Sequence, residues 1–266
     1  MPLRKSDHYR SGGITIDIDW IQLPLIWAAV LFASLLRSFT GFGFALAAVP
    51  VFSMFLPPAE AVVLSSSLAL AISLLSLPSY WGIVSLREMV PLVSTSLLGT
   101  MVGAALLTGI SVALFQLWVG LSVLLACLGI TLSRPAKPLK NPALPWATGG
   151  LSGLMNGALG IPGPPMIIFA MLTEFDPRRS RALLMTFFVV SSSMALISYS
   201  VAGLVKLPSL WYFLLAFPVL YLGDKLGTRL FLRYGDAFYR RVALLGLAAI
   251  GVMITLRALL APVLHQ

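Results

Sequence analysis

Two glycine-rich interruptions of long apolar stretches carry the residues best suited to bind a charged ligand. The first runs from Arg37 to Gly43, and the second runs from Gly149 to Pro165 and contains six glycines. A helix broken in an apolar environment leaves backbone N–H groups and a dipole end free, and the N-terminal end of such a half-helix suits an anion. Paired interruptions of this kind indicate a transporter binding site. The alternative is close packing of helices through small residues.

Two polar residues beside these interruptions are candidate anion contacts. Asn156 is the only asparagine within an apolar segment, and its amide can donate two hydrogen bonds while staying neutral. Arg37 directly precedes the first interruption and would supply the positive charge that attracts an anion. The alternative for Arg37 is a side chain at a helix end that reaches the cytoplasmic interface.

Hydroxyl clusters follow each interruption, at 65–67 and at 186–193. Hydroxyl groups can donate hydrogen bonds to an oxyanion without the desolvation cost of a charge, although in membrane helices they also bond to their own backbone carbonyls. The candidate substrate-binding residues are Arg37, Thr40, Gly41, Gly43, Ser66, Asn156, Gly157, Gly160 and Thr186.

Enzymatic chemistry has little support in the sequence. The two histidines, His8 and His265, lie in the terminal tails, so neither a zinc site nor a serine–histidine dyad can form inside the apolar part. Asp224 and Lys225 are adjacent, and we expect an ion pair at the cytoplasmic end of a helix rather than a proton relay. The sequence therefore predicts no enzyme activity, no metal and no cofactor.

The composition predicts a membrane protein. The chain has 266 residues, of which 59% are hydrophobic and 10% charged, against roughly 25% charged in a typical soluble domain. A soluble globule is therefore excluded, and no polar stretch is long enough for a catalytic domain outside the membrane. The formal charge of +9 comes from cations in short loops, which indicate orientation rather than nucleic-acid binding. We expect no cleaved signal peptide.

Apolar segments of helical length fill nearly the whole chain, and they predict an all-α polytopic fold. A proline-rich linker at 133–145 divides a first repeat (20–132) from a second (146–262), with short polar tails at 1–19 and 263–266. The segments are 20–38, 42–57, 59–81, 89–109, 111–132, 146–161, 162–175, 180–203, 207–231 and 238–262.

The two halves resemble each other. At an offset of 124 residues, Gly99 matches Gly223 and Gly103 matches Gly227. Five segments per half is an odd number, so if all of them cross, the second half enters the membrane from the opposite side. This predicts two inverted repeats, an architecture common in secondary transporters. Segments 42–57 and 162–175 are too short to span comfortably, and either can be a half-helix or a re-entrant piece.

The distribution of cations predicts the orientation. With strict alternation of the segments, twelve Lys and Arg residues fall on one face and five on the other. Because loops on the cytoplasmic side carry the excess of cations, the linker lies in the cytoplasm and both termini lie outside it.

The stretches 41–69 (GFGFALAAVPVFSMFLPPAEAVVLSSSLA) and 149–193 (GGLSGLMNGALGIPGPPMIIFAMLTEFDPRRSRALLMTFFVVSSS) resemble the paired glycine-rich signatures of the sulfite exporter TauE/SafE family of integral membrane transporters. The resemblance covers both halves, nearly the whole chain after residue 20. It implies transport of a small sulfur-containing or organic anion, such as sulfite or a sulfonate, across the bacterial inner membrane.

We therefore expect a transporter that moves a small anion through the lipid bilayer by alternating access. The alternatives are a transporter of an unrelated solute and a non-transporting accessory or assembly protein. A coupling ion, either proton or sodium, and a homodimer are compatible with the sequence.

Overall fold

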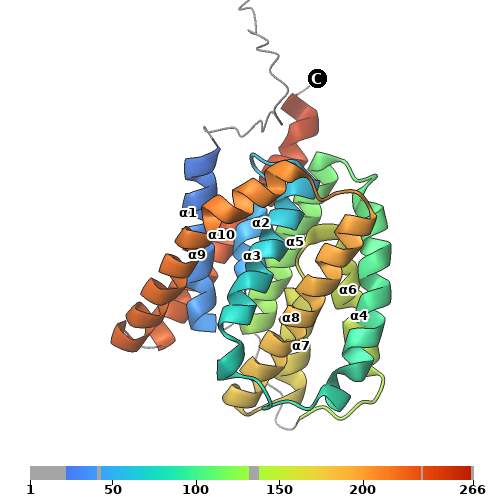
Figure 1. Cartoon of the computed structure of the whole chain (residues 1–266), viewed down its shortest axis with the longest axis vertical. Helices are drawn as coiled ribbons and strands as arrows, with labels where there is room; N and C mark the ends of the chain where they lie inside the picture. The colour runs from blue at the N-terminus through green and yellow to red at the C-terminus, as the bar shows by residue number, and fades with distance from the viewer. Residues whose placement is uncertain (1–21, 41–42, 132–137, 235, 265–266) are drawn as a thin grey trace, which may run out of the picture.

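The fold is an all-α bundle, as the sequence predicts. The computed structural model describes residues 22–40, 43–131, 138–234 and 236–264, and this part of the chain contains no strand. Each predicted apolar segment corresponds to one α-helix (Figure 1). The helices are α1 (Leu23–Thr40), α2 (Phe44–Phe52), α3 (Pro58–Leu75), α4 (Leu86–Leu107), α5 (Val112–Thr131), α6 (Leu144–Leu159), α7 (Gly163–Thr173), α8 (Pro177–Val201), α9 (Leu207–Tyr234) and α10 (Asp236–Leu264), with a 3-10 turn η1 (Leu77–Ser79) after α3.

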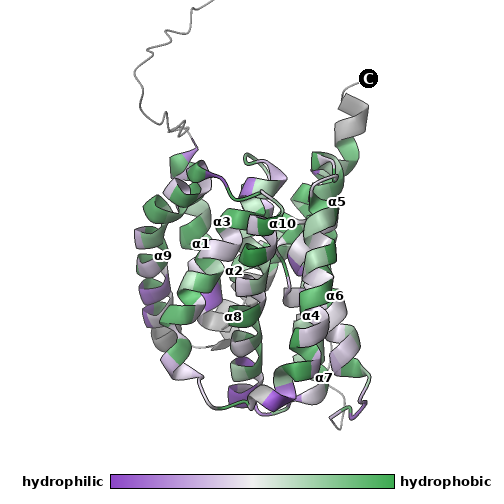
Figure 2. Ribbon diagram, turned by 45° about the vertical axis from the view of Figure 1, so that its right-hand side comes forward, coloured by the Kyte–Doolittle hydropathy of each residue, from purple (hydrophilic) through white to green (hydrophobic). Residues whose placement is uncertain are grey.

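The surface of the bundle suits a bilayer. Helices α3, α4, α5, α8 and α9 are long and apolar enough to cross a membrane. Large apolar side chains such as Leu98 and Leu128 are more than half exposed, which suits lipid rather than water. Figure 2 shows that the flanks are mainly hydrophobic and that hydrophilic residues gather at the end where α8 begins. The protein is therefore a multi-pass membrane protein.

The helices define two ends of the bundle. In Figure 1, α1 begins and α10 ends at one end, called here the terminal end. Helices α4 and α8 begin at the other end, called the linker end.

The two short predicted segments are half-helices that turn back. Helix α2 has 9 residues and α7 has 11, so at about 1.5 Å per residue neither spans a hydrocarbon core about 30 Å thick. Gln116 Nε2, near the start of α5, donates to Ser53 O at 2.6 Å, which places the end of α2 at the terminal end. Leu139 N donates to Leu172 O at 2.8 Å, which places the end of α7 near the linker.

Each half therefore begins with a helical hairpin and continues with three through-going helices. The hairpin of α1 and α2 enters from the terminal end, and the hairpin of α6 and α7 enters from the linker end. The expectation that all five segments of a half could cross is thus corrected to three. Three is still an odd number, which is consistent with two inverted repeats.

Small residues hold the hairpins against the opposite halves. Gly149, Gly153 and Gly157 on α6 contact the backbone of α4 at successively later residues, so these two helices run parallel. Gly223 and Gly227 on α9 contact α1 at Ser34 and Ser38, mainly through the serine side chains. Because Gly99 and Gly103 of α4 also lie in the α4–α6 contact, the glycines matched at an offset of 124 perform the same packing in both halves. Helix α3 packs on α8 and α5 packs on α10, a pairing consistent with inverted repeats.

Candidate functional site

Both hairpin turns line one small cavity of about 30 Å³. The turns come from opposite ends of the bundle, and helices α3 and α8 complete the wall between them. The α1–α2 hairpin contributes Arg37, Gly43, Phe44, Ala45 and Leu46; the α6–α7 hairpin contributes Asn156, Gly160, Ile161, Pro162 and Gly163; α3 contributes Ser66, Ala69 and Ser73; and α8 contributes Phe188 and Ser192.

Glycine is required at both turns for conformational reasons. Gly43 precedes α2 with a φ of 100° and Gly160 ends α6 with a φ of 66°, a left-handed region that strains residues with a side chain. At the end of α6, Gly160 N donates to Asn156 O at 2.8 Å and Ile161 N donates to Met155 O at 3.4 Å. The bond from Gly160 N to the carbonyl four residues earlier, with Gly160 left-handed, is an αL C-cap, which ends the helix at the cavity.

The two half-helices differ in what they offer an anion. At the start of α2, the N–H groups of Phe44, Ala45 and Leu46 precede the first intrahelical bond, from Ala47 N to Gly43 O, and all three residues line the cavity. At the start of α7, Pro164 and Pro165 have no N–H group. A helix end with free N–H groups is therefore present at the first turn and largely missing at the second.

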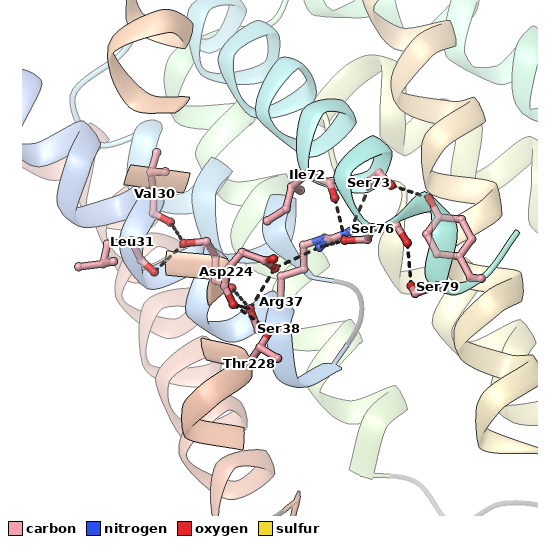
Figure 3. A network of polar contacts seen from close by, with 12 residues as sticks. Val30, Leu31, Arg37, Ser38, Ile72, Ser73, Ser76, Ser79, Asp224 and Thr228 are labelled. Atoms are coloured by element: carbon pink, nitrogen blue, oxygen red, sulfur yellow. Dashed lines mark hydrogen bonds and ion pairs between the residues drawn. The ribbon is translucent and has the colours of Figure 1, made fainter. Parts of the chain in front are cut away.

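Arg37 is a buried cation at the edge of the cavity. It is 4% exposed, so its side chain is directed into the bundle and not along its surface. Its guanidinium donates to Ser76 Oγ at 3.3 Å and to Ser73 Oγ at 3.5 Å, and Nη1 lies 3.6 Å from Asp224 Oδ1 (Figure 3). The expectation that Asp224 pairs with Lys225 is wrong, because Asp224 pairs with Arg37 across the α1–α9 contact.

Asn156 connects the cavity to α8. It is 1% exposed, and its Nδ2 donates to Ser191 O at 2.8 Å. Its backbone O accepts a hydrogen bond from Tyr199 Oη at 2.6 Å. One amide N–H is therefore committed to the protein, which leaves the second N–H and Oδ1 for a ligand.

Some serine hydroxyls in and near the cavity are hydrogen-bonded to the protein, and others are free. Ser66 lines the cavity but is hydrogen-bonded to Tyr199, and Ser67 donates to Val63 O of its own helix at 2.8 Å. Ser192 also lines the cavity, is 5% exposed and makes no hydrogen bond within the described part of the chain. Sequence analysis included Ser192 in a cluster but did not select it, because the face of α8 that meets the cavity was not known.

The structure brings Arg37, Gly43, Ser66, Asn156 and Gly160 together around the cavity. The remaining candidates lie elsewhere: Gly157 packs against α4, Thr186 is buried in α8 away from the cavity lining, Thr40 ends α1 and its side chain is not described, and Gly41 lies outside the described residues. Within the described residues, no group of three or more His, Cys, Asp or Glu side chains could hold a metal ion.

Comparison with known proteins decides the class of this protein. The sequence model of the family described as sulfite exporter TauE/SafE matches residues 26–254. The chain belongs to this family. The match spans both halves of the TauE/SafE chain, including the two hairpin turns, Arg37 and Asp224. Membership supports a membrane transporter rather than an enzyme.

One curated relative covers nearly the whole TauE/SafE chain. It is the probable sulfite/organosulfonate exporter TauE of Cupriavidus necator, 27% identical over 252 residues, which make up 92% of this chain and 98% of the relative. No solved structure matches the chain.

Proposed function

We propose that this protein carries a small anion, such as sulfite, an organosulfonate or a related organic anion, across the bacterial inner membrane. The observation that carries the proposal is the convergence of two hairpin turns, one from each half, on a cavity that holds a buried arginine. A charge at membrane depth costs about 2.5 to 3.5 kcal/mol on insertion scales, and an anionic substrate gives Arg37 a function that justifies this cost.

The donors around the cavity suit an oxyanion. The free N–H groups at the start of α2, the second amide N–H of Asn156 and the hydroxyl of Ser192 are neutral, so they orient the anion without binding it too tightly for release. Among the described residues of the lining, Arg37 supplies the single positive charge. The small size of the cavity favours a small solute in this conformation.

The arrangement of the helices supports alternating access. The cavity lies between the halves, and each hairpin packs through small residues on a long helix of the other half. A movement of one half against the other would expose the cavity to one side and then to the other. The prediction that the linker lies in the cytoplasm and both termini outside it belongs to this proposal.

Flux into liposomes tests the proposal. Wild-type protein should move sulfite and short alkanesulfonates, and Arg37→Gln should lower flux per folded molecule by about tenfold or more, about 1.4 kcal/mol. Arg87→Gln is the matched control, because Arg87 is an exposed arginine at the start of α4 and outside the cavity lining. Folded wild-type protein that moves no anion would overturn the proposal and favour a non-transporting role.

A further inference from the structure

The ion pair between Arg37 and Asp224 joins the cavity to a partly exposed carboxylate. Arg37 lines the cavity and its side chain is 5% exposed, whereas the side chain of Asp224 is 24% exposed. The carboxylate also accepts a hydrogen bond from Ser38 Oγ at 3.2 Å. The contacts that Arg37 makes to Ser73, Ser76 and Asp224 are all 3.3 Å or longer (Figure 3), so its donors are held loosely.

Asp224 supplies the negative charge beside Arg37. Among the described residues, the other ion pairs join Arg179 to Glu88 and to Glu174, in a separate cluster at the linker end. Without Asp224, the guanidinium charge would be buried with only serine hydroxyls around it, and an unpaired buried charge is strongly destabilising. The pair therefore explains how the anion-free protein tolerates Arg37.

An anion in the cavity would disturb this balance. It would place a second negative charge beside Arg37 while Asp224 is still ionised, and like charges at close range in a low-dielectric site disfavour each other. A proton that adds to Asp224 removes the conflict, because the neutral carboxyl no longer competes for the guanidinium.

We propose that Asp224 is the resident counter-anion of Arg37 and takes up one proton from water when the transported anion binds. This inference rests on the proposed anion site. The proton adds to a carboxylate oxygen of Asp224, and the anion replaces that carboxylate as the charge partner of Arg37. Binding of the anion and of the proton are then linked reciprocally, so each favours the other.

Among the residues whose side chains are described, the other charged groups near Asp224 are cations or remain neutral. Helix α8 contributes Arg181, which attracts the Asp224 carboxylate, and α9 itself contributes Lys225, whose Nζ lies 5.5 Å from the ring centre of Tyr221. Between α3 and α4, burial raises the pKa of Tyr80 to about 12 although Arg37 lies nearby, so its phenol stays neutral and donates to Ser73 O at 2.7 Å.

Two further helices pack on α9 near this position. Near Asp224, helix α3 contributes the hydroxyls of Ser73 and Ser76; its one charged residue, Glu60, lies in its first turn. In α10, side chains are described for Leu245–Leu260, and the single charged residue among them is Arg257, toward the terminal end. Among the described side chains near the cavity, Asp224 is therefore the carboxylate that can take up a proton when an anion binds.

Proton uptake by the purified protein tests the inference directly. The probe is ethanesulfonate, because sulfite exchanges protons itself near neutral pH. In weakly buffered solution with an indicator dye, wild-type protein should take up about one proton per bound anion, and its affinity should fall as the pH rises. Binding without proton uptake would overturn the inference and leave the anion site intact, whereas absence of binding would count against the proposed function.

The variant Asp224→Asn keeps an oxygen that accepts from Ser38 but cannot ionise. It should bind ethanesulfonate without proton uptake, with little dependence on pH, and at least about tenfold more tightly than wild type at mildly alkaline pH. Glu60→Gln is the control, because Glu60 lies in the first turn of α3, about 20 Å along the helix from Ser73. It should behave as wild type.

A double variant covers the case in which Asp224→Asn leaves Arg37 too poorly paired to fold. Arg37→Gln with Asp224→Asn removes both charges together, so it should recover folded protein and lose ethanesulfonate binding. If the double variant still bound the anion and took up a proton, both Arg37 and Asp224 would be excluded from the coupling.

Discussion

Ser191 and Ser192 are neighbours on α8, but their hydroxyls have different surroundings. The Ser192 hydroxyl faces the cavity without a protein partner, whereas the Ser191 hydroxyl is buried without a partner and outside the cavity lining. A hydroxyl free in the cavity can donate to an oxyanion. We therefore expect Ser192→Ala to weaken anion binding by about tenfold, about 1.4 kcal/mol, and Ser191→Ala to leave binding unchanged. Titration calorimetry with ethanesulfonate measures both, and equal affinities for the two variants would contradict this assignment.

Asn156 has both a structural and a proposed ligand-binding role, which two variants separate. Asn156→Ala removes the amide at the cavity and its bond to Ser191 O, so flux per folded molecule should fall by about tenfold or more. Tyr199→Phe removes a bond to Asn156 O on the same α6–α8 contact and the bond with the Ser66 hydroxyl, but it removes no polar group from the cavity lining itself. It should lower the free energy of unfolding by about 1 kcal/mol with normal flux per folded molecule. Flux and thermal melting distinguish the two, and normal flux in folded Asn156→Ala would remove Asn156 from the site.

Sequence analysis could select Arg37 and Asn156 because a charge or an amide is conspicuous in an apolar segment. It could not select Ser192, since serine is common in these helices and its role depends on the face that it occupies. Sequence analysis also could not identify Asp224 as the partner of Arg37. Asp224 lies in the other half of the chain, and nothing in one sequence specifies that contact. Gly157 shows the opposite error. It was selected as a site residue because it lies in a broken segment, but it packs against α4 and does not line the cavity.

At the scale of the elements, α6 and α4 are held together by direct backbone contact. A Cβ atom on Gly153 would collide with the backbone of Ser96, whereas one on Gly150 would meet only the Thr95 side chain, at 3.9 Å. Gly153→Ala should therefore force α6 away from α4 and lower the melting temperature in detergent. Gly150→Ala should keep or raise it, since alanine favours a helix by up to about 1 kcal/mol over glycine. A Gly153→Ala protein as stable as Gly150→Ala would contradict this packing.

The helices themselves were largely predictable, because apolar segments of this length in a chain with few charges have few alternatives to transmembrane helices. Segments 42–57 and 162–175 were recognisably too short to span. Both segments are half-helices that turn back because Gly43 and Gly160 adopt a left-handed conformation. A glycine in the sequence permits this conformation without specifying it. The inequality of the two turns follows from Pro164 and Pro165, which remove N–H donors from α7 only. From the sequence, the two interruptions were treated only as a pair.

At the scale of the whole molecule, the two halves interlock. Each hairpin packs on a long helix of the other half, and the helices α3 with α8 and α5 with α10 meet directly. Neither half could bury its small-residue faces alone, so the cavity and the fold depend on the same contacts. This explains why Arg37 of the first half finds its counter-charge on α9 of the second.

The same arrangement fixes a topology that reporter fusions can test. The start of α1 and the end of α10 lie at the terminal end, and Arg87, Arg178 and Arg229 lie on helix segments toward the linker end (Figure 1). Because cations collect on the cytoplasmic side, a reporter active only in the cytoplasm should give strong signal when inserted at the linker after Lys137 and little signal when fused after Gln266. A reporter active only outside the cytoplasm should give the reverse. Cytoplasmic signal from both positions would mean an even number of crossings between the linker and the C-terminus, against a re-entrant hairpin of α6 and α7 followed by three crossing helices. Signals reversed at both positions would instead keep the fold and show that the cation excess does not set its orientation.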